Sequence, residues 1–115
     1  MANDFKNAIA QNVSNAAGGT TIYTTPATKT SIMLELDIAN TTTSVIEASV
    51  EVLDSSVSAS GWRYLVKNAP VPTGGSLMVI AGQKIVLEAG DKVRVTSSAA
   101  SSMDVVAAIL EDVNS

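Results

Sequence analysis

The chain contains no cysteine and no histidine, and aromatic residues make up only 3% of its 115 residues. Without cysteine, no disulfide can support the fold, and no thiolate can act as a nucleophile or bind a metal. Without histidine, the chain by itself cannot form the usual zinc sites or the Ser-His and Cys-His pairs of nucleophilic enzymes. These two absences exclude most catalytic chemistry, and we expect a protein that is not an enzyme.

Basic residues are also few, with seven Lys and Arg against eleven Asp and Glu, so the formal charge is −4. Because phosphate binding depends on clustered lysine and arginine, this balance argues against a nucleic-acid partner. No apolar run is long enough to cross a bilayer, and the first residues do not resemble a signal peptide. We therefore expect a soluble protein made in the cytoplasm, with no membrane partner and with unused glycosylation sequons at Asn12 and Asn40.

The length fits one domain, and the apolar fraction of 46% comes mainly from Val, Ala, Ile and Leu. A core built from these side chains is thin and aliphatic. Such a core suits two sheets packed face to face at about 10 Å.

Residues 1–19 are rich in Asn, Ala and Gln and end in Ala-Ala-Gly-Gly, which we interpret as a flexible hinge. We predict an extended or partly helical N-terminal arm over residues 1–19, followed by a sandwich domain over residues 20–115. Phe5, Ile9 and Val13 recur every four residues and would share one stripe of a helix, although such a helix is marginal in water. We expect the arm to be held by a neighbouring subunit or by the domain's own surface.

From Thr20 onward, apolar and polar residues alternate with a period of two, which predicts β-strands. The prolines within residues 68–75 indicate a surface connection there. The expected strands cover residues 20–25, 30–39, 44–53, 62–67, 76–80, 83–88, 91–96 and 103–113. This spacing predicts an all-β, two-sheet sandwich of about eight strands, of jelly-roll or immunoglobulin-like type.

The strand over residues 30–39 has the clearest alternation, and four apolar residues are predicted to face the core: Ile32, Leu34, Leu36 and Ile38. Met33 falls on the opposite face, with Glu35 and Asp37. Because Met33, Val45 and Leu53 are apolar residues on nominally polar faces, they indicate a surface that another subunit covers.

The last apolar run, residues 103–113, has two interpretations. Its Ala, Leu, Met and Glu content is compatible with a helix that starts near Ser102. The β-branched pair Val105-Val106 favours a strand, and a strand buried on both faces fits the composition.

Carboxylates are the remaining candidates for acid, base or metal chemistry. Glu35, Asp37, Glu47 and Glu51 would lie on one face of a hairpin, where oxygen ligands could bind a cation such as calcium. A solvated strand face is the simpler interpretation. No nucleophile elbow or phosphate-binding loop is present, so we predict no catalytic residue, no metal site and no cofactor.

Trp62 and Tyr64 share one strand face and flank Arg63, and these residue types often anchor protein interfaces. Because the chain has few aromatic residues, filling the core is an equally good role for these two side chains. The candidate interface residues are Phe5, Ile9, Val13, Met33, Trp62 and Tyr64.

The segment over residues 83–95 contains a hairpin in which Gly90 permits a positive φ and Asp91 can bond to its own backbone. This hairpin resembles those of jelly-roll and related sandwiches in assembled proteins. Together with residues 22–27, 37–41 and 70–72, it makes residues 20–112 similar to small virion structural proteins of tailed bacteriophages.

The resemblance implies a non-enzymatic protein of the virion, made in the host cytoplasm, that decorates a capsid or forms part of a neck or tail. Its implied partners are a major capsid or neck or tail protein and further copies of itself. No functional residue can be carried over from the family. The alternative is a carbohydrate or host-surface binding module of a tail fibre, which would need Tyr23, Trp62 and Tyr64 to stack on sugar rings. A hydrolase would need a convergent pair of carboxylates in a pocket.

Overall fold

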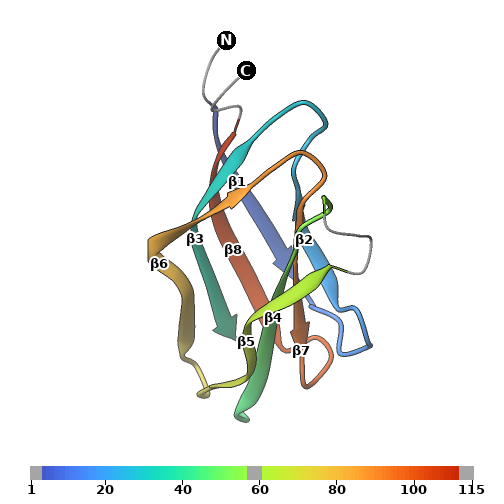
Figure 1. Ribbon diagram of the computed structural model, residues 1–115. Coiled ribbons are helices and arrows are strands. Elements are labelled where there is room, and N and C mark those ends of the chain that lie inside the picture. Colours follow the sequence, from blue (N-terminus) through green and yellow to red (C-terminus); the bar gives the residue numbers. More distant parts are fainter. Residues whose placement is uncertain (1–3, 57–60, 112–115) are drawn as a thin grey trace.

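The computed structural model describes residues 4–56 and 61–111, which form eight β-strands in two antiparallel sheets (Figure 1). The strands are β1 (Asp4–Gln11), β2 (Thr20–Thr24), β3 (Ser31–Asn40), β4 (Ile46–Leu53), β5 (Trp62–Val71), β6 (Ser76–Leu87), β7 (Lys92–Ser97) and β8 (Met103–Glu111). Residues 1–3 of the predicted arm, residues 57–60 and the predicted end of the last strand at Val113 lie outside the described residues. Within the described ranges, no helix is long and apolar enough to cross a membrane.

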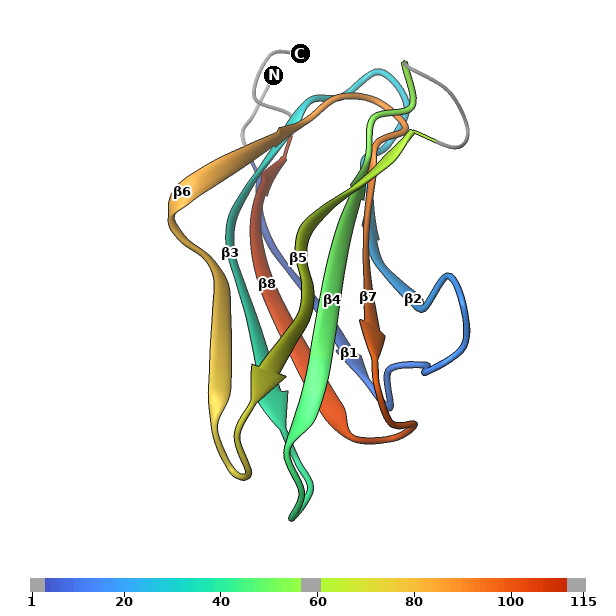
Figure 2. The same ribbon diagram turned by 60° about the horizontal axis from the view of Figure 1, so that its bottom comes forward.

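The first sheet has the strand order β1-β8-β3-β6, and the second has the order β2-β7-β4-β5. The two sheets face each other as layers of a sandwich (Figure 2). Eight antiparallel strands in this order form a jelly roll. The predicted β-sandwich is therefore confirmed, and of its two predicted types the strand order is that of the jelly roll.

The core between the sheets is aliphatic, as the composition predicts. Alternate residues of β8, from Met103 to Ile109, are at most 1% exposed, and they share one cluster with Val93 and Val95 of β7. Complete burial of a side chain of this size stabilises the fold by about 1.5–3 kcal/mol. Residues 103–111 are thus a strand, and the helical alternative is wrong.

A β-bulge at Leu34 changes which side chains of β3 face the core. The pairing of β3 shifts between Met33 and Glu35 against both of its neighbours, β6 and β8. One extra residue moves the alternation by one position, so Met33 and Ile32 exchange faces relative to the prediction. Met33 is fully buried in the core, and the expectation that it is exposed is wrong. Beyond the bulge, Leu36 is buried as predicted.

Leu53 is likewise buried rather than exposed, whereas Val45 is exposed as expected. Leu53 pairs with Trp62 across β4 and β5.

Two predicted boundaries differ from the structure. Residues 76–87 form one long, bent strand instead of two (Figure 1). β5 continues through Pro70 to Val71, where a surface connection was predicted. β5 lies at the edge of its sheet, where a proline is tolerated because one row of N–H groups has no partner strand.

The N-terminal segment is extended, so of the two forms predicted for it, extended or partly helical, the described residues adopt the extended one. β1 pairs along its whole length with β8, from Asp4 opposite Glu111 to Gln11 opposite Asp104. Val13 follows the strand and is fully buried in the core. The domain's own sheet therefore holds this segment, while its separation from residues 20–115 as a functional arm stays a prediction.

The Gly18-Gly19 pair forms a tight turn rather than a flexible hinge. Gly19 has φ of 56°, and its N–H donates a hydrogen bond to the Ala16 carbonyl at 3.0 Å. A Cβ atom at Gly19 would lie 2.3 Å from the carbonyl oxygen of Val95. Glycine is needed here because the turn packs directly on the backbone of β7.

We predict that Gly19→Ala lowers the free energy of unfolding by about 3 kcal/mol, because it adds a backbone clash to an unfavourable φ. Gly74→Ala is the matched control, since Gly74 has φ of +65° but no atom within 4 Å of an added Cβ. We expect Gly74→Ala to lower the free energy of unfolding by about 1 kcal/mol. Urea denaturation of both variants measures the difference, and equal costs would show that residues 18–19 are a loose hinge.

Candidate interaction surface

The outer face of the first sheet exposes large apolar side chains. In β1, Ala8 and Ala10 pack against the core, while Phe5 and Ile9 point outward and are 78% and 74% exposed. Exposure of this degree on a regular strand is costly in water unless another surface covers it.

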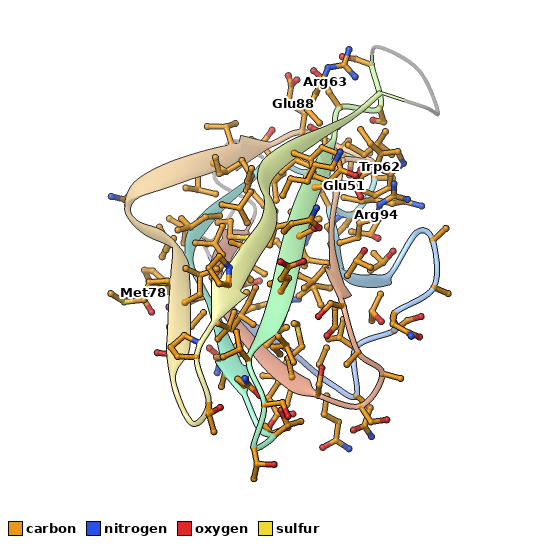
Figure 3. All side chains as sticks on the ribbon, turned by 90° about the horizontal axis from the view of Figure 1, so that it is seen from below. Glu51, Trp62, Arg63, Met78, Glu88 and Arg94 are labelled. Carbon is orange, nitrogen blue, oxygen red and sulfur yellow. The ribbon has the colours of Figure 1, made fainter. Side chains whose placement is uncertain are left out.

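The register extends this outer face across all four strands as two rows, in which Met78, Val86 and Val106 are also exposed and the other three members are partly buried. One row contains Phe5, Leu110, Ile32 and Val86, and the other contains Ile9, Val106, Asp37 and Met78. We call these eight residues the apolar sheet face. Figure 3 shows Met78 projecting from β6, far from the cluster around Trp62 on the second sheet. The face therefore spans the sheet from edge to edge.

An open hollow of about 450 Å³ lies at the β1 end of this face. It is lined by residues 9–11 of β1 and residues 104–106 of β8. Ile9 and Val106 supply apolar walls, and Asp104 supplies a carboxylate. The hollow is large enough to receive one side chain of a docked partner.

The charges on the same face are mostly negative. Glu35 and Asp104 are exposed, and Asp37 sits between Val106 and Met78 in the second row. One carboxylate oxygen of Asp37 is buried and has no hydrogen-bond partner among the described residues. Lys84 is the cation that the described part of β6 contributes to this side.

The four carboxylates considered as a cation site do not converge. Glu35 and Asp37 lie on β3 in the first sheet, whereas Glu47 and Glu51 lie on β4 in the second. The prediction of a β3–β4 hairpin with one acidic face is wrong, because the connection crosses between the sheets.

A buried polar network around Glu111 holds β1 against its neighbours. The Glu111 side chain is 3% exposed, and its Oε1 atom forms an ion pair with Lys6 Nζ at 3.0 Å. The Tyr23 hydroxyl donates to Glu111 Oε2 at 2.5 Å and lies 2.8 Å from Ser31 Oγ. Since Tyr23 belongs to the second sheet and the other groups to the first, this network joins the two sheets and fixes the end of β1 that carries Phe5.

The network shifts the pKa of both titrating partners. The hydrogen bond from Tyr23, helped by Lys6, holds the pKa of Glu111 below its usual value despite burial. Burial and the neighbouring Glu111 carboxylate raise the pKa of Tyr23 to about 12. At neutral pH, Glu111 is therefore ionised and Tyr23 is a neutral donor.

The second sheet carries an aromatic cluster on its outer side. The guanidinium of Arg94 lies 3.8 Å from the centroid of the Trp62 ring and makes two hydrogen bonds to Glu51, at 3.0 and 3.1 Å (Figure 3). Lys67 Nζ lies 5.2 Å from the Tyr64 ring centroid. A cation thus covers one face of each ring, which leaves less aromatic surface for stacking on a sugar.

Three further carboxylates, from Asp54, Glu88 and Asp91, lie within 4.8 Å of one another. Asp91 accepts hydrogen bonds from the Ser55 N–H and hydroxyl, each at 3.0 Å, and from the Glu88 N–H at 2.9 Å. The predicted bond of Asp91 to its own backbone is instead a bond to the Glu88 N–H in the preceding turn. The oxygens of Asp91 are used to join two turns.

The predicted interface residues therefore have different surroundings. Phe5 and Ile9 are exposed on the apolar sheet face, Tyr64 is exposed on β5, Trp62 is partly buried, and Val13 and Met33 are buried. The involvement of the exposed residues in an interface stays a prediction.

Sequence reasoning did not identify Val106, Leu110, Met78 and Val86 as part of this surface. β8 was expected to be buried on both faces, but Val106 is exposed. The alternation over residues 103–111 could have identified the outward residues. The alternation could not show that no layer formed by the described residues covers these side chains.

Fold and surface thus define a jelly-roll β-sandwich with one exposed apolar sheet face. No protein-family model matches the chain, and no curated protein matches it. The structure of infectious bursal disease virus Gt strain contains a similar chain, with a TM-score of 0.41 and 13% sequence identity. The match covers 95% of this chain but only 35% of that one, so the protein spans about a third of its length. Likeness at this level carries no argument about function.

We predict that Tyr23→Phe lowers the free energy of unfolding at neutral pH by about 2 kcal/mol, because the Glu111 carboxylate loses a buried donor. The folded-state pKa of Tyr23, about 12, lies above the ordinary value of 10.0. Its contribution is therefore complete below pH 10 and is lost as the pH rises towards 12. Chemical denaturation from pH 7 to 12 measures this loss, and Tyr64→Phe is the control. Parallel pH profiles for Tyr23→Phe and wild type would contradict the prediction.

Proposed function

We propose that the protein is a non-enzymatic structural component of a virus particle and that its apolar sheet face docks on another virion protein. The observation that carries the proposal is the pair of apolar rows that cross the first sheet with no layer of the described chain over them. The two rows contain seven apolar side chains and one acid, Asp37, and large apolar side chains are typical of the centre of a protein interface.

The fold is compatible with this role by analogy. Jelly rolls occur in viral capsid proteins and in lectins. The fold is therefore compatible with both a virion structural role and carbohydrate binding and does not distinguish between them. The resemblance of residues 20–112 to small virion proteins of tailed bacteriophages favours the former. In its finer form, the proposal is a decoration protein of the capsid or a connector of the neck or tail, assembled in the host cytoplasm.

The rigidity of the surface also suits an assembly role. The Glu111 network pins β1 to its sheet and the bulge at Leu34 places Ile32 on the outer face, so the two rows need no rearrangement before docking. A preformed surface loses little conformational entropy on binding.

A carbohydrate-binding module of a tail fibre is the second candidate, because Tyr64 is exposed and adjoins Trp62. Arg94 and Lys67 already cover one face of these rings, which weakens this candidate. A glycan array probed with wild type and Trp62→Ala tests it, and specific binding that the substitution abolishes would favour it over the structural role.

The test of the structural role uses particles produced with wild-type or variant protein. We predict that Ile9→Glu reduces the copies of the protein per particle at least tenfold, because it places a charge at the centre of a dry interface. Quantitative mass spectrometry of purified particles measures the copy number.

Val45→Glu is the matched control. Val45 is 64% exposed but lies in the connection between β3 and β4, outside the apolar sheet face. It should leave incorporation unchanged. Full incorporation of folded Ile9→Glu protein, or absence of the wild-type protein from particles, would contradict the proposed function.

A further inference from the structure

The surface charge of the sandwich is divided between two regions. The outer side of the first sheet carries three carboxylates, Glu35, Asp37 and Asp104, and one cation, Lys84, which gives a local charge of −2. β5, at the edge of the other sheet, contains Arg63 and Lys67 and no acid. The two regions are therefore complementary in charge although the chain as a whole is acidic.

β5 also carries the apolar groups that an interface needs. Tyr64 is 51% exposed, and its neighbour Leu65 is exposed as well. Both side chains lie between the two cations in the sequence. Tyrosine is among the residues that most often anchor an interface, and β5, as an edge strand, has a neighbouring strand on one side only.

We propose that a second copy of this chain occupies the apolar sheet face, with β5 of one copy lying on the first sheet of the next. Tyr64 enters the hollow between Ile9 and Val106, and Lys67, which lies over the Tyr64 ring, faces Asp104 and Asp37. This inference rests on the proposed function, because both use the apolar sheet face. It adds the identity of the partner and the geometry of the contact.

The charge of the face argues against the other way of pairing two copies. Two apolar sheet faces packed on each other would bring six carboxylates and two lysines into one interface, and the like charges would repel. Asp37 would then lie close to further acids instead of a cation. Contact between the face and β5 supplies Asp37 with a cation.

A contact between two different surfaces is heterologous, so a pair of copies keeps one unused apolar sheet face and one unused β5. Successive copies can then close into a ring or extend along a lattice. Symmetric copies in a particle would use the same contact repeatedly.

The test measures the mass of the purified protein by light scattering and sedimentation velocity as its concentration is raised. The monomer has a mass of 11.8 kDa. We expect wild type to form dimers and larger species, while Ile9→Glu and Tyr64→Glu each stay monomeric. An equimolar mixture of the two variants should form a heterodimer and nothing larger, because it retains one intact face and one intact β5. Added salt should weaken this association.

Val45→Glu should associate like wild type, and circular dichroism should show that every variant is folded. If Ile9→Glu does not fold, Met78→Glu replaces it at the other end of the same row. Wild type that stays monomeric at all concentrations, Tyr64→Glu that still dimerises alone, or a mixture that forms no heterodimer would each overturn the inference. A monomeric wild type whose incorporation into particles still depends on Ile9 would overturn the inference and leave the proposed function standing.

Discussion

The structure depends on the burial of aliphatic side chains between two sheets, since the chain has no disulfide and few aromatics to add to its core. Every strand must therefore present alternate side chains to the interior, and β8 does so between two neighbours in the same sheet. Because side chains alternate along a strand, the residues that face inward determine which residues face outward. The same alternation that builds the core creates the outer rows, so the candidate surface is a direct product of the folding pattern.

Buried polar groups connect strands and turns that the apolar core alone does not hold in place. Glu111 ties the first strand of the chain to the last and reaches the second sheet through Tyr23, while Asp91 joins two turns at the same end of the sandwich. A buried carboxylate is expensive unless its oxygens are paired, so such groups specify one arrangement of the sheets. The apolar sheet face is rigid for the same reason, because the ion pair between Lys6 and Glu111 fixes β1, its edge strand.

The two-residue alternation was sufficient to predict the sandwich and most inward residues. The predicted number of strands agrees with the structure only because two errors cancel: β1 was missed, and β6 was divided into two strands. The alternation failed as a guide at Leu34, where one extra residue interrupts it. The bulge there involves no unusual residue type, yet it moves Met33 into the core. β1 was missed because its asparagine and alanine content does not favour a strand, and its pairing with β8 supplies the stability that the local sequence lacks. Phe5 and Ile9 were proposed as interface residues because they would share one stripe of a helix, but they are exposed on a strand. The rows could not be predicted, because they join residues of four strands that are distant in the sequence.

The pairing of Asp4 with Glu111 brings the beginning of β1 and the end of β8 together at one pole of the sandwich, as Figure 1 shows. The turn between β3 and β4 lies at the opposite pole, and the principal axes of the molecule measure 45 × 27 × 21 Å. A peptide fused to either strand end would consequently emerge from the same pole, along the long dimension and away from the flat sides of the molecule. Cargo displayed there would leave the sheets free for assembly.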